Sequence, residues 1–104
     1  MIFRRDRFGD AIARQLAVFA EDEAELLAEC RDKEREYGRS GRDVAEEAYG
    51  DYMDVVETAT EALADMRDRF GRTLDDAAGE EYEAEFNNAV RKRWPAFGLE
   101  IENR

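Results

Sequence analysis

The chain has 104 residues, of which 43% are hydrophobic and 41% are charged, and it contains seven glycines and one proline. This length suits one domain, and this composition favours a soluble helical protein over a strand-rich fold or a disordered chain. There is no histidine, one cysteine (Cys30) and one serine (Ser40). These counts exclude a Ser-His-Asp triad, a Cys-His dyad, a zinc site built on His or several Cys, and an intramolecular disulfide.

Acidic residues dominate the charge. There are 27 of them against 16 basic residues, which gives a formal net charge of −11. The windows 21–29, 43–65 and 75–85 hold five, eight and six acids and no base. Such runs are typical of solvated helical surfaces, with a divalent-cation site or a docking face for a basic protein partner as alternatives. The acidity argues against nucleic acid as a partner.

The sequence shows no sign of membrane insertion or export. No apolar run approaches the roughly 20 residues that a bilayer span requires. The N-terminus carries Arg4, Arg5 and Arg7 without the apolar segment that follows in a secretory signal. A single cysteine is compatible with a reducing compartment. We therefore expect a cytoplasmic protein with no membrane partner.

The spacing of apolar residues predicts a first helix over residues 8–37. The apolar seam alternates steps of four and three, with Glu23 and Lys33 at two of its positions, and consists of Ile12, Leu16, Phe19, Leu26, Cys30 and Tyr37. Leu27 can take the place that Glu23 leaves empty. We expect the Glu23 carboxylate to bend out to solvent, the alternative being that a cation or metal holds it inside.

A second helix is predicted over residues 42–70. Its apolar positions repeat at steps of four and three without a miss and are Ala45, Tyr49, Tyr52, Val56, Ala59, Leu63, Met66 and Phe70. The opposite face carries Glu47, Asp54, Glu61 and Asp68, which we expect to point at water. Gly50 lies in the helix interior, where it costs about 1 kcal/mol relative to Ala. It is either tolerated or marks the close approach of a large neighbour.

A third helix is predicted over residues 74–94, with Thr73 as its N-cap and Pro95 as its stop. The apolar positions at steps of four are Leu74, Ala78, Tyr82, Phe86, Val90 and Trp94. For the tail, residues 95–104, we expect Phe97 to dock on the bundle and the rest to be mobile.

These elements predict an all-α, up-down-up three-helix bundle, with two long helices and a shorter third, as a single domain over residues 1–104. Counting residues from the two turns predicts three aromatic layers. They place Trp94 near Cys30, Tyr49 and Tyr52, Tyr82 near Phe19 and Leu63, and Phe8 near Phe70 and Leu74.

The third helix is too short to cover the full length of the other two. An uncovered apolar strip usually marks an interface, and two-fold symmetry is the commonest way to bury it. We therefore expect a homodimer with an interface formed by Tyr37, Tyr49, Tyr52, Trp94 and Phe97. The alternative is a monomer in which the tail covers the strip.

One resemblance is carried by residues 22–27, which read DEAELL, and residues 46–51, which read EEAYGD. Together they resemble the paired ExxE and ExxD helices of the MazG-type, all-α nucleotide pyrophosphohydrolases. The resemblance implies magnesium as a cofactor, held by Asp22, Glu25, Glu47 and Asp51, and hydrolysis of a nucleoside triphosphate. The chain departs from that pattern, because Glu47 and Asp51 are one residue too far apart and Asp22 replaces a Glu.

Our leading hypothesis is a non-catalytic helical interaction or assembly protein that uses no cofactor and no catalytic residue. Cys30 lies in the seam of the first helix, and without a neighbouring base we expect it to be a small buried hydrophobe. The alternative is a magnesium-dependent, MazG-like pyrophosphohydrolase.

Overall fold

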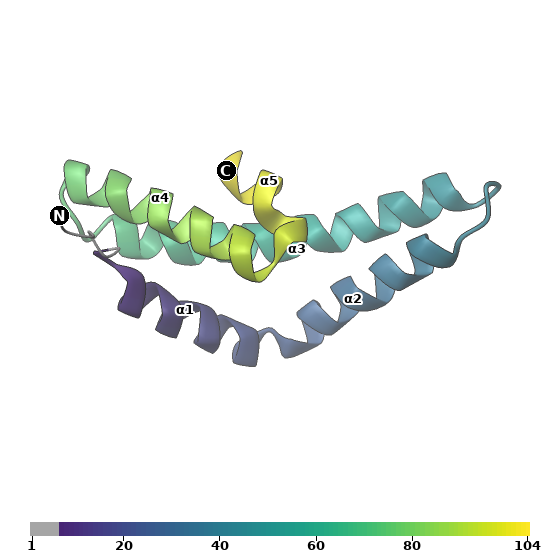
Figure 1. The fold of residues 1–104 in the computed structure, drawn as a ribbon, viewed down its shortest axis with the longest axis horizontal. Helices are drawn as coiled ribbons and strands as arrows, with labels where there is room; N and C mark the ends of the chain where they lie inside the picture. The colour runs from purple at the N-terminus through teal and green to yellow at the C-terminus, as the bar shows by residue number, and fades with distance from the viewer. Residues whose placement is uncertain (1–6) are drawn as a thin grey trace, which may run out of the picture.

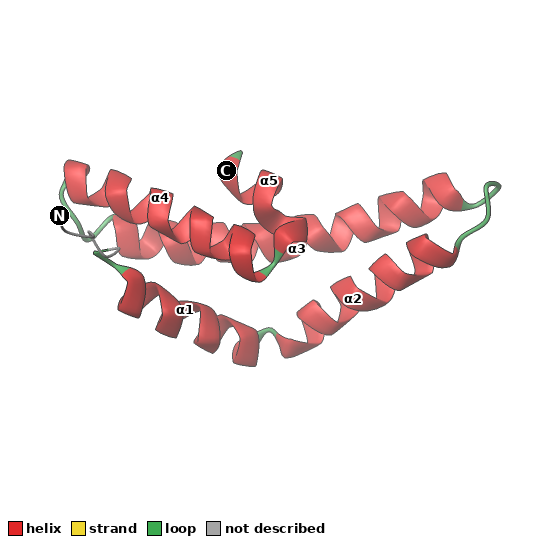
Figure 2. Cartoon of the chain, in the orientation of Figure 1, coloured by secondary structure: helices red, strands yellow, loops and turns green. Residues whose placement is uncertain are grey.

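The computed structural model describes residues 7–104, and all their regular structure is helical (Figure 2). The elements along the chain are α1 (Gly9–Asp22), α2 (Ala24–Arg39), α3 (Ala45–Gly71), α4 (Asp76–Arg93), the 3-10 helix η1 (Pro95–Phe97) and α5 (Gly98–Glu102). The all-α class is confirmed. The count of three helices is wrong, since this part of the chain forms five α-helices. Arg4 and Arg5 lie outside the described residues.

The helices form a body and an arm (Figure 1). In the body, α1 and the C-terminal half of α3 pack against α4, and α5 contacts both α3 and α4. The arm, which we define as residues 24–39 and 45–55, is an antiparallel pair formed by α2 and the N-terminal half of α3 (Figure 1). The arm projects beyond the end of α4, and the molecule measures 53 × 30 × 22 Å.

The predicted first helix is interrupted at Glu23, where α1 and α2 meet at an angle (Figure 1). Glu23 leaves the helical conformation with φ −111° and ψ 32°. Phe19 is buried on α1, and the next buried residue of this stretch is Leu27 rather than Leu26. The break therefore keeps the apolar faces of both helices on the core while Glu23 stays half-buried at the junction.

α3 runs along the long axis of the molecule and has 27 residues, which corresponds to a length of about 40 Å. The predicted seam lies inward in its central part, where Val56, Ala59 and Leu63 are completely buried. The predicted outward face is confirmed, because Glu47, Asp54, Glu61 and Asp68 are all exposed. A second buried stripe, which the sequence analysis missed, consists of Thr60, Ala64 and Arg67.

α4 begins two residues later than predicted, and its N-cap is Asp75 rather than Thr73. The Asp75 side chain accepts a hydrogen bond of 2.8 Å from the Ala78 amide. The Thr73 hydroxyl instead donates to the Phe70 carbonyl, so it belongs to the end of α3. A Cβ added at Gly79 would lie 3.6 Å from the Gly71 carbonyl oxygen, so the residues on either side of this turn are in ordinary van der Waals contact.

The tail is helical, contrary to the expected mobility beyond Phe97. Pro95 ends α4 as predicted and begins η1, which leads directly into α5. Phe97 is buried, as predicted, and Ile101 is buried as well, whereas Leu99 is 77% exposed. Alternation of the apolar residues in this segment therefore reflects a short helix with one buried face.

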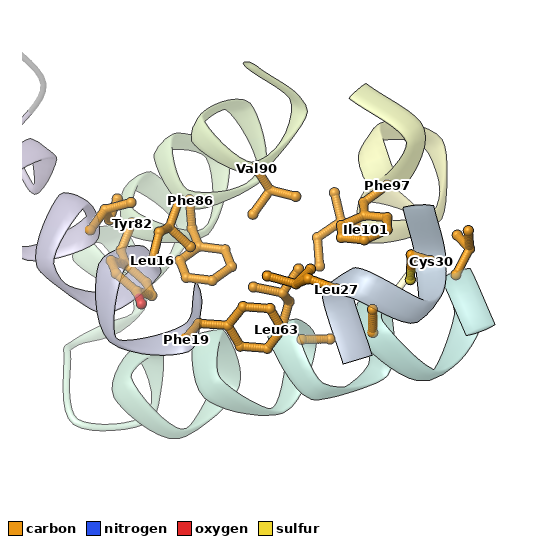
Figure 3. Packing of buried hydrophobic residues seen from close by; sticks show 14 residues of the cluster. Leu16, Phe19, Leu27, Cys30, Leu63, Tyr82, Phe86, Val90, Phe97 and Ile101 are labelled. Carbon is orange, nitrogen blue, oxygen red and sulfur yellow. The ribbon is translucent and has the colours of Figure 1, made fainter. Parts of the chain in front are cut away.

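The core is a single cluster to which every helix contributes, as Figure 3 shows for Phe19 of α1, Leu27 of α2 and Leu63 of α3, with α4 and α5 closing the other side. Its aromatic layers differ from the prediction. Tyr82 contacts the rings of Phe8, Phe70 and Phe86, at centroid distances of 5.5, 4.7 and 5.8 Å. Tyr82 was predicted to lie near Phe19 and Leu63, but it packs beside Phe8 and Phe70. The residues of α4 therefore lie closer to the α3–α4 turn, by one aromatic layer, than residue counting predicted.

Candidate functional site

The arm is the most distinctive surface of the molecule because only two helices build it. Leu27 and Cys30 are buried on the inner face of α2, and the Cys30 thiol lies 3.6 Å from the Val55 carbonyl oxygen of α3. At the far end, the Ser40 hydroxyl donates a 2.7 Å hydrogen bond to the Tyr37 carbonyl and closes the turn. No helix of the described chain covers the outer part of this pair in the way that α4 covers the body (Figure 1).

Three aromatic side chains gather near the end of the arm, and we call Tyr37, Tyr49 and Tyr52 the tyrosine cluster. The Tyr37 ring lies 5.2 Å from the Tyr49 ring and stacks on the Tyr52 ring at 6.3 Å. Tyr37 and Tyr49 remain 39% and 48% exposed, which confirms that the end of the pair is uncovered in a single chain. Tyrosine suits such a surface because it joins a large apolar ring to a polar tip.

The most enclosed member of the cluster is Tyr52. Its hydroxyl donates to the Glu34 carboxylate at 3.5 Å. Partial burial, and then the negative charge of Glu34, raise the pKa of the Tyr52 phenol above its ordinary value. The phenol is therefore neutral at physiological pH and serves as a hydrogen-bond donor rather than a base.

Two residues of the predicted interface lie elsewhere. Trp94 contacts the rings of Phe19 and Phe97, at 5.7 and 5.9 Å, instead of Tyr49 and Tyr52. Phe97 is only 3% exposed. Both positions have one explanation. Because α4 lies closer to the α3–α4 turn than predicted, its C-terminal end packs in the body and does not reach the arm. The predicted tyrosines thus come together on the arm, whereas Trp94 and Phe97 close the core.

The exposed surface of α2 mixes both signs of charge, whereas that of the N-terminal half of α3 is acidic; the exposed acids of α2 are Glu25, Glu29, Asp32, Glu34 and Glu36. On α2, Arg31, Arg35 and Arg39 recur at steps of four and are exposed, and we call them the arginine strip. On α3, residues 45–65 contain no base. Within the described residues, the only ion pair of the arginine strip joins Arg35 to Asp32 on the same helix. The two sets of charges therefore do not pair within one chain.

Gly50 lies at the centre of the acidic side. Its helical neighbours Glu46, Glu47 and Asp54, which we call the Gly50 carboxylates, are exposed and form no ion pair within residues 7–104. A Cβ built at Gly50 would have no atom within 4 Å outside its own helix backbone and chain neighbours. Within residues 7–104, therefore, no large neighbour approaches Gly50, and the helix tolerates the glycine there.

The four carboxylates of the predicted magnesium site do not come together. Asp22 and Glu25 flank the junction of α1 and α2, whereas Glu47 and Asp51 lie on the first turns of α3, at the far end of the arm. Among residues 7–104, no group of three or more Asp, Glu, Cys or His side chains is placed to hold a metal ion. The geometry therefore gives the pyrophosphohydrolase alternative no metal centre in this part of the chain.

Cys30 offers little reactivity. It is buried, and desolvation, followed by the charge of Glu29, raises the pKa of its thiol. A raised pKa keeps the sulfur protonated, and the thiol is a poor nucleophile compared with the thiolate. The structure agrees with the expectation that Cys30 is a packing residue.

Sequence reasoning missed the polar groups that fix the body. The Arg67 side chain is 2% exposed and donates to the Asn87 side-chain oxygen and to the Ile101 carbonyl, at 3.0 and 3.1 Å. The Glu85 carboxylate accepts hydrogen bonds from the amides of Arg7 and Phe8 at the start of α1. The one signal for Arg67 is that it follows Thr60 and Ala64 at helical spacing, on a face that becomes buried.

No protein-family model matches the chain, and comparison with curated proteins and with solved structures gives no match. In the described part of the chain, no helix has both the length and the apolar character of a membrane span. The arm and its side chains are therefore the features of this molecule that bear on its function.

Proposed function

We propose that this protein is a non-catalytic assembly module of the cytoplasm, in which the body holds the arm and the arm binds a second copy of the chain. The sequence predicted a three-helix bundle with one uncovered end. In the body-and-arm structure, the arm corresponds to that uncovered end. The proposed interface residues are the tyrosine cluster. A basic protein is the second partner class that the acidity favours.

The observation that carries this proposal is the exposure of Tyr37 and Tyr49 on a two-helix pair. Two helices alone bury only one side of each apolar stripe, so the other side needs a partner. The nearby Val44 is also 45% exposed, so the apolar surface continues past the tyrosines to the turn. Interfaces are enriched in tyrosine at their buried centres. A second arm brings the same tyrosines and completes a four-helix bundle.

Light scattering coupled to gel filtration tests the proposal at micromolar concentration. One chain has a mass of 12.0 kDa, and we expect the native protein to elute with twice that mass. The double variant Tyr37→Gln/Tyr49→Gln should elute as a monomer, because it removes the exposed apolar rings and leaves the core residues Leu27 and Cys30 intact.

A matched control is Val18→Gln/Leu99→Gln. Apart from Tyr37, Val44 and Tyr49, these two positions are the large exposed hydrophobic side chains of the described residues, at 51% and 77%, and both lie on the body. The control should remain dimeric. A native protein that stays monomeric at high micromolar concentration would overturn the proposal, and so would a tyrosine variant that dimerises as well as the native chain.

A further inference from the structure

The outer part of the arm is held together with little burial. We define the outer arm as residues 31–39 of α2 and 45–53 of α3, and none of these residues is buried. By contrast, α1, α4 and α5 each contain at least two buried residues. Among the described residues, the ring contacts and hydrogen bonds that join the two helices here are those of the tyrosine cluster and Glu34. Segments with so few buried contacts open at a low cost in free energy.

The outer part of α3 is also a weak helix by composition. Gly50 lies in its interior, where glycine is the least favourable residue other than proline. A Cβ added at Gly50 would have no contact within 4 Å, so no packing within residues 7–104 compensates for the glycine. These turns therefore depend on the tyrosine cluster to stay helical.

A row of like charges weakens the same turns. Asp51, Asp54 and Glu57, which we call the acidic row, follow each other at steps of three and are exposed. They form no ion pair within residues 7–104, and residues 45–65 contain no base that could separate their charges. Like charges three or four residues apart are neighbours on a helix and destabilise it. Glu46 and Glu47 differ, because they lie in the first turn, where negative charge is favourable.

The rest of the molecule does not share this one-sided charge. α2 mixes both signs, and its described ion pairs join residues of the same helix. In the body, ion pairs join different elements, as Arg7 does with Glu81 and Arg91 with Glu102. Salt screens exposed charges of either kind. It therefore weakens attractions in the body but relieves repulsion in the outer part of α3.

We propose that the outer arm responds to ionic strength. At low salt the first turns of α3 unwind and separate from α2, and at high salt they re-form and bring the tyrosine cluster together. The Debye length falls from about 30 Å at 0.01 M salt to about 3 Å at 1 M, and neighbouring charges on a helix are about 5–6 Å apart. The consequence rests on the proposed function, because a second copy binds only the closed arm. Ionic strength thus controls dimerisation through the fold of the arm.

Cys30 reports the opening in the native chain. It is the one cysteine of the sequence, and its buried thiol lies 3.6 Å from the Val55 carbonyl oxygen, just inside the outer arm. The probe is dithiodipyridine, a neutral disulfide that the acidic chain neither attracts nor repels. At protein concentrations low enough to keep the chain monomeric, we expect labelling to be about five to ten times faster in about 0.01 M than in about 1 M sodium chloride.

Neutralising the acidic row tests the cause. The variant Asp51→Asn/Asp54→Asn/Glu57→Gln should label slowly even at low salt and should lose most of the salt dependence. The matched control Glu21→Gln/Glu80→Gln/Glu83→Gln removes three exposed acids of the body and changes the net charge equally. It should keep the full salt dependence. Equal behaviour of the two variants would show that total charge, not the acidic row, sets the response, and would overturn the inference.

Gly50→Ala tests how weak the outer turns are by a route that does not involve charge. Alanine favours the helix, so labelling of Cys30 should slow about fivefold at both salt concentrations. The ratio of the two rates should stay as in the native chain, because the acidic row is intact. An unchanged labelling rate would mean that Cys30 is reached without unwinding of these turns, and the inference would then be wrong.

Amide hydrogen exchange locates the effect along the chain. Salt should slow exchange in residues 45–53 and leave the amides of α4 unchanged. Equal slowing in α4 would show that salt acts on the whole fold, which would overturn the inference. Light scattering separates the two proposals. If the native protein is a dimer at both salt concentrations and labelling of its monomer is independent of salt, the proposed function stands and the salt response is wrong. If it is a monomer at every salt and protein concentration, the proposed function fails, and with it the control of dimerisation.

Discussion

The guanidinium group of Arg67 donates a hydrogen bond of 3.1 Å to the main-chain oxygen of Ile101, thirty-four positions later in the chain. The same group donates to the Arg104 main-chain oxygen at 2.7 Å. Both acceptors lie at the C-terminal end of α5, where a positive charge is favourable, and the Ile101 oxygen also accepts a hydrogen bond of 3.3 Å from the Arg104 amide. A buried cation of α3 thus fixes the last helix on the body.

Replacing Arg67 by alanine should destabilise the protein strongly. The change opens a cavity in the core and leaves the buried Asn87 side-chain oxygen without its donor, whereas the Ile101 carbonyl keeps the Arg104 amide. Each buried acceptor that loses its partner costs about 1–3 kcal/mol, so we expect a loss of roughly 2–4 kcal/mol in the free energy of unfolding. Chemical denaturation followed by circular dichroism measures it.

The control for this change is Arg14→Ala. Arg14 is exposed on α1, and within residues 7–104 it forms no ion pair. Its removal should change the free energy of unfolding by about 0.5 kcal/mol or less. Equal effects of the two substitutions would contradict the role assigned to Arg67.

Glu85 caps α1 from a different helix. Its carboxylate accepts from the Phe8 amide at 2.8 Å and the Arg7 amide at 3.2 Å, and no side chain of α1 caps this end. We expect Glu85→Ala to cost about 1 kcal/mol, as the loss of a local cap does. Amide hydrogen exchange should accelerate first in the N-terminal turn of α1. Glu83→Ala, at an exposed position of the same helix, should have little effect.

The sequence predicted those features that depend on periodicity. Steps of four and three place Val56, Ala59 and Leu63 on one face of a helix, and the structure buries them all. The exposure of Tyr37 followed from comparing helix lengths, since α4 has 18 residues and α3 has 27. Gathering of the tyrosines on the arm followed from the antiparallel pairing that a short turn imposes.

Features that depend on contacts between distant residues were not predictable. The break at Glu23 contains neither glycine nor proline, so its only local mark is that Glu23 interrupts the apolar seam. The turn after α3 continues to Asp75 instead of Thr73, so α4 starts later than predicted. The sequence does not determine which core residues Trp94 then contacts. Arg67 is buried because α5 returns to α3 with its carbonyls toward the guanidinium, and a lone arginine on a helix is otherwise expected at the surface.

Gly98 is required by the packing of α5 on α4. A Cβ at this position would lie 2.9 Å from the Arg91 Cγ, close to the backbone of α4, so Arg91 or α5 would have to move. We expect Gly98→Ala to cost about 1–3 kcal/mol despite the better helix propensity of alanine. Gly38→Ala, where an added Cβ would have no neighbour, should have a neutral or stabilising effect on unfolding. A stabilising effect of Gly98→Ala would show that α5 is loosely docked.

Tyr82 gives the protein a defined weakness at high pH. Its hydroxyl is 2.8 Å from the Gln15 side-chain oxygen, and burial raises the pKa of Tyr82 to about 12, against an ordinary value of 10.0. Between these two pH values the unfolded chain loses the proton while the folded chain keeps it, so the free energy of unfolding should fall as pH rises, by up to roughly 2–3 kcal/mol. Ultraviolet titration of the folded protein should show one of its four tyrosines ionising only near pH 12. That late step should be missing in Tyr82→Phe, and its persistence in this variant would assign it to another tyrosine.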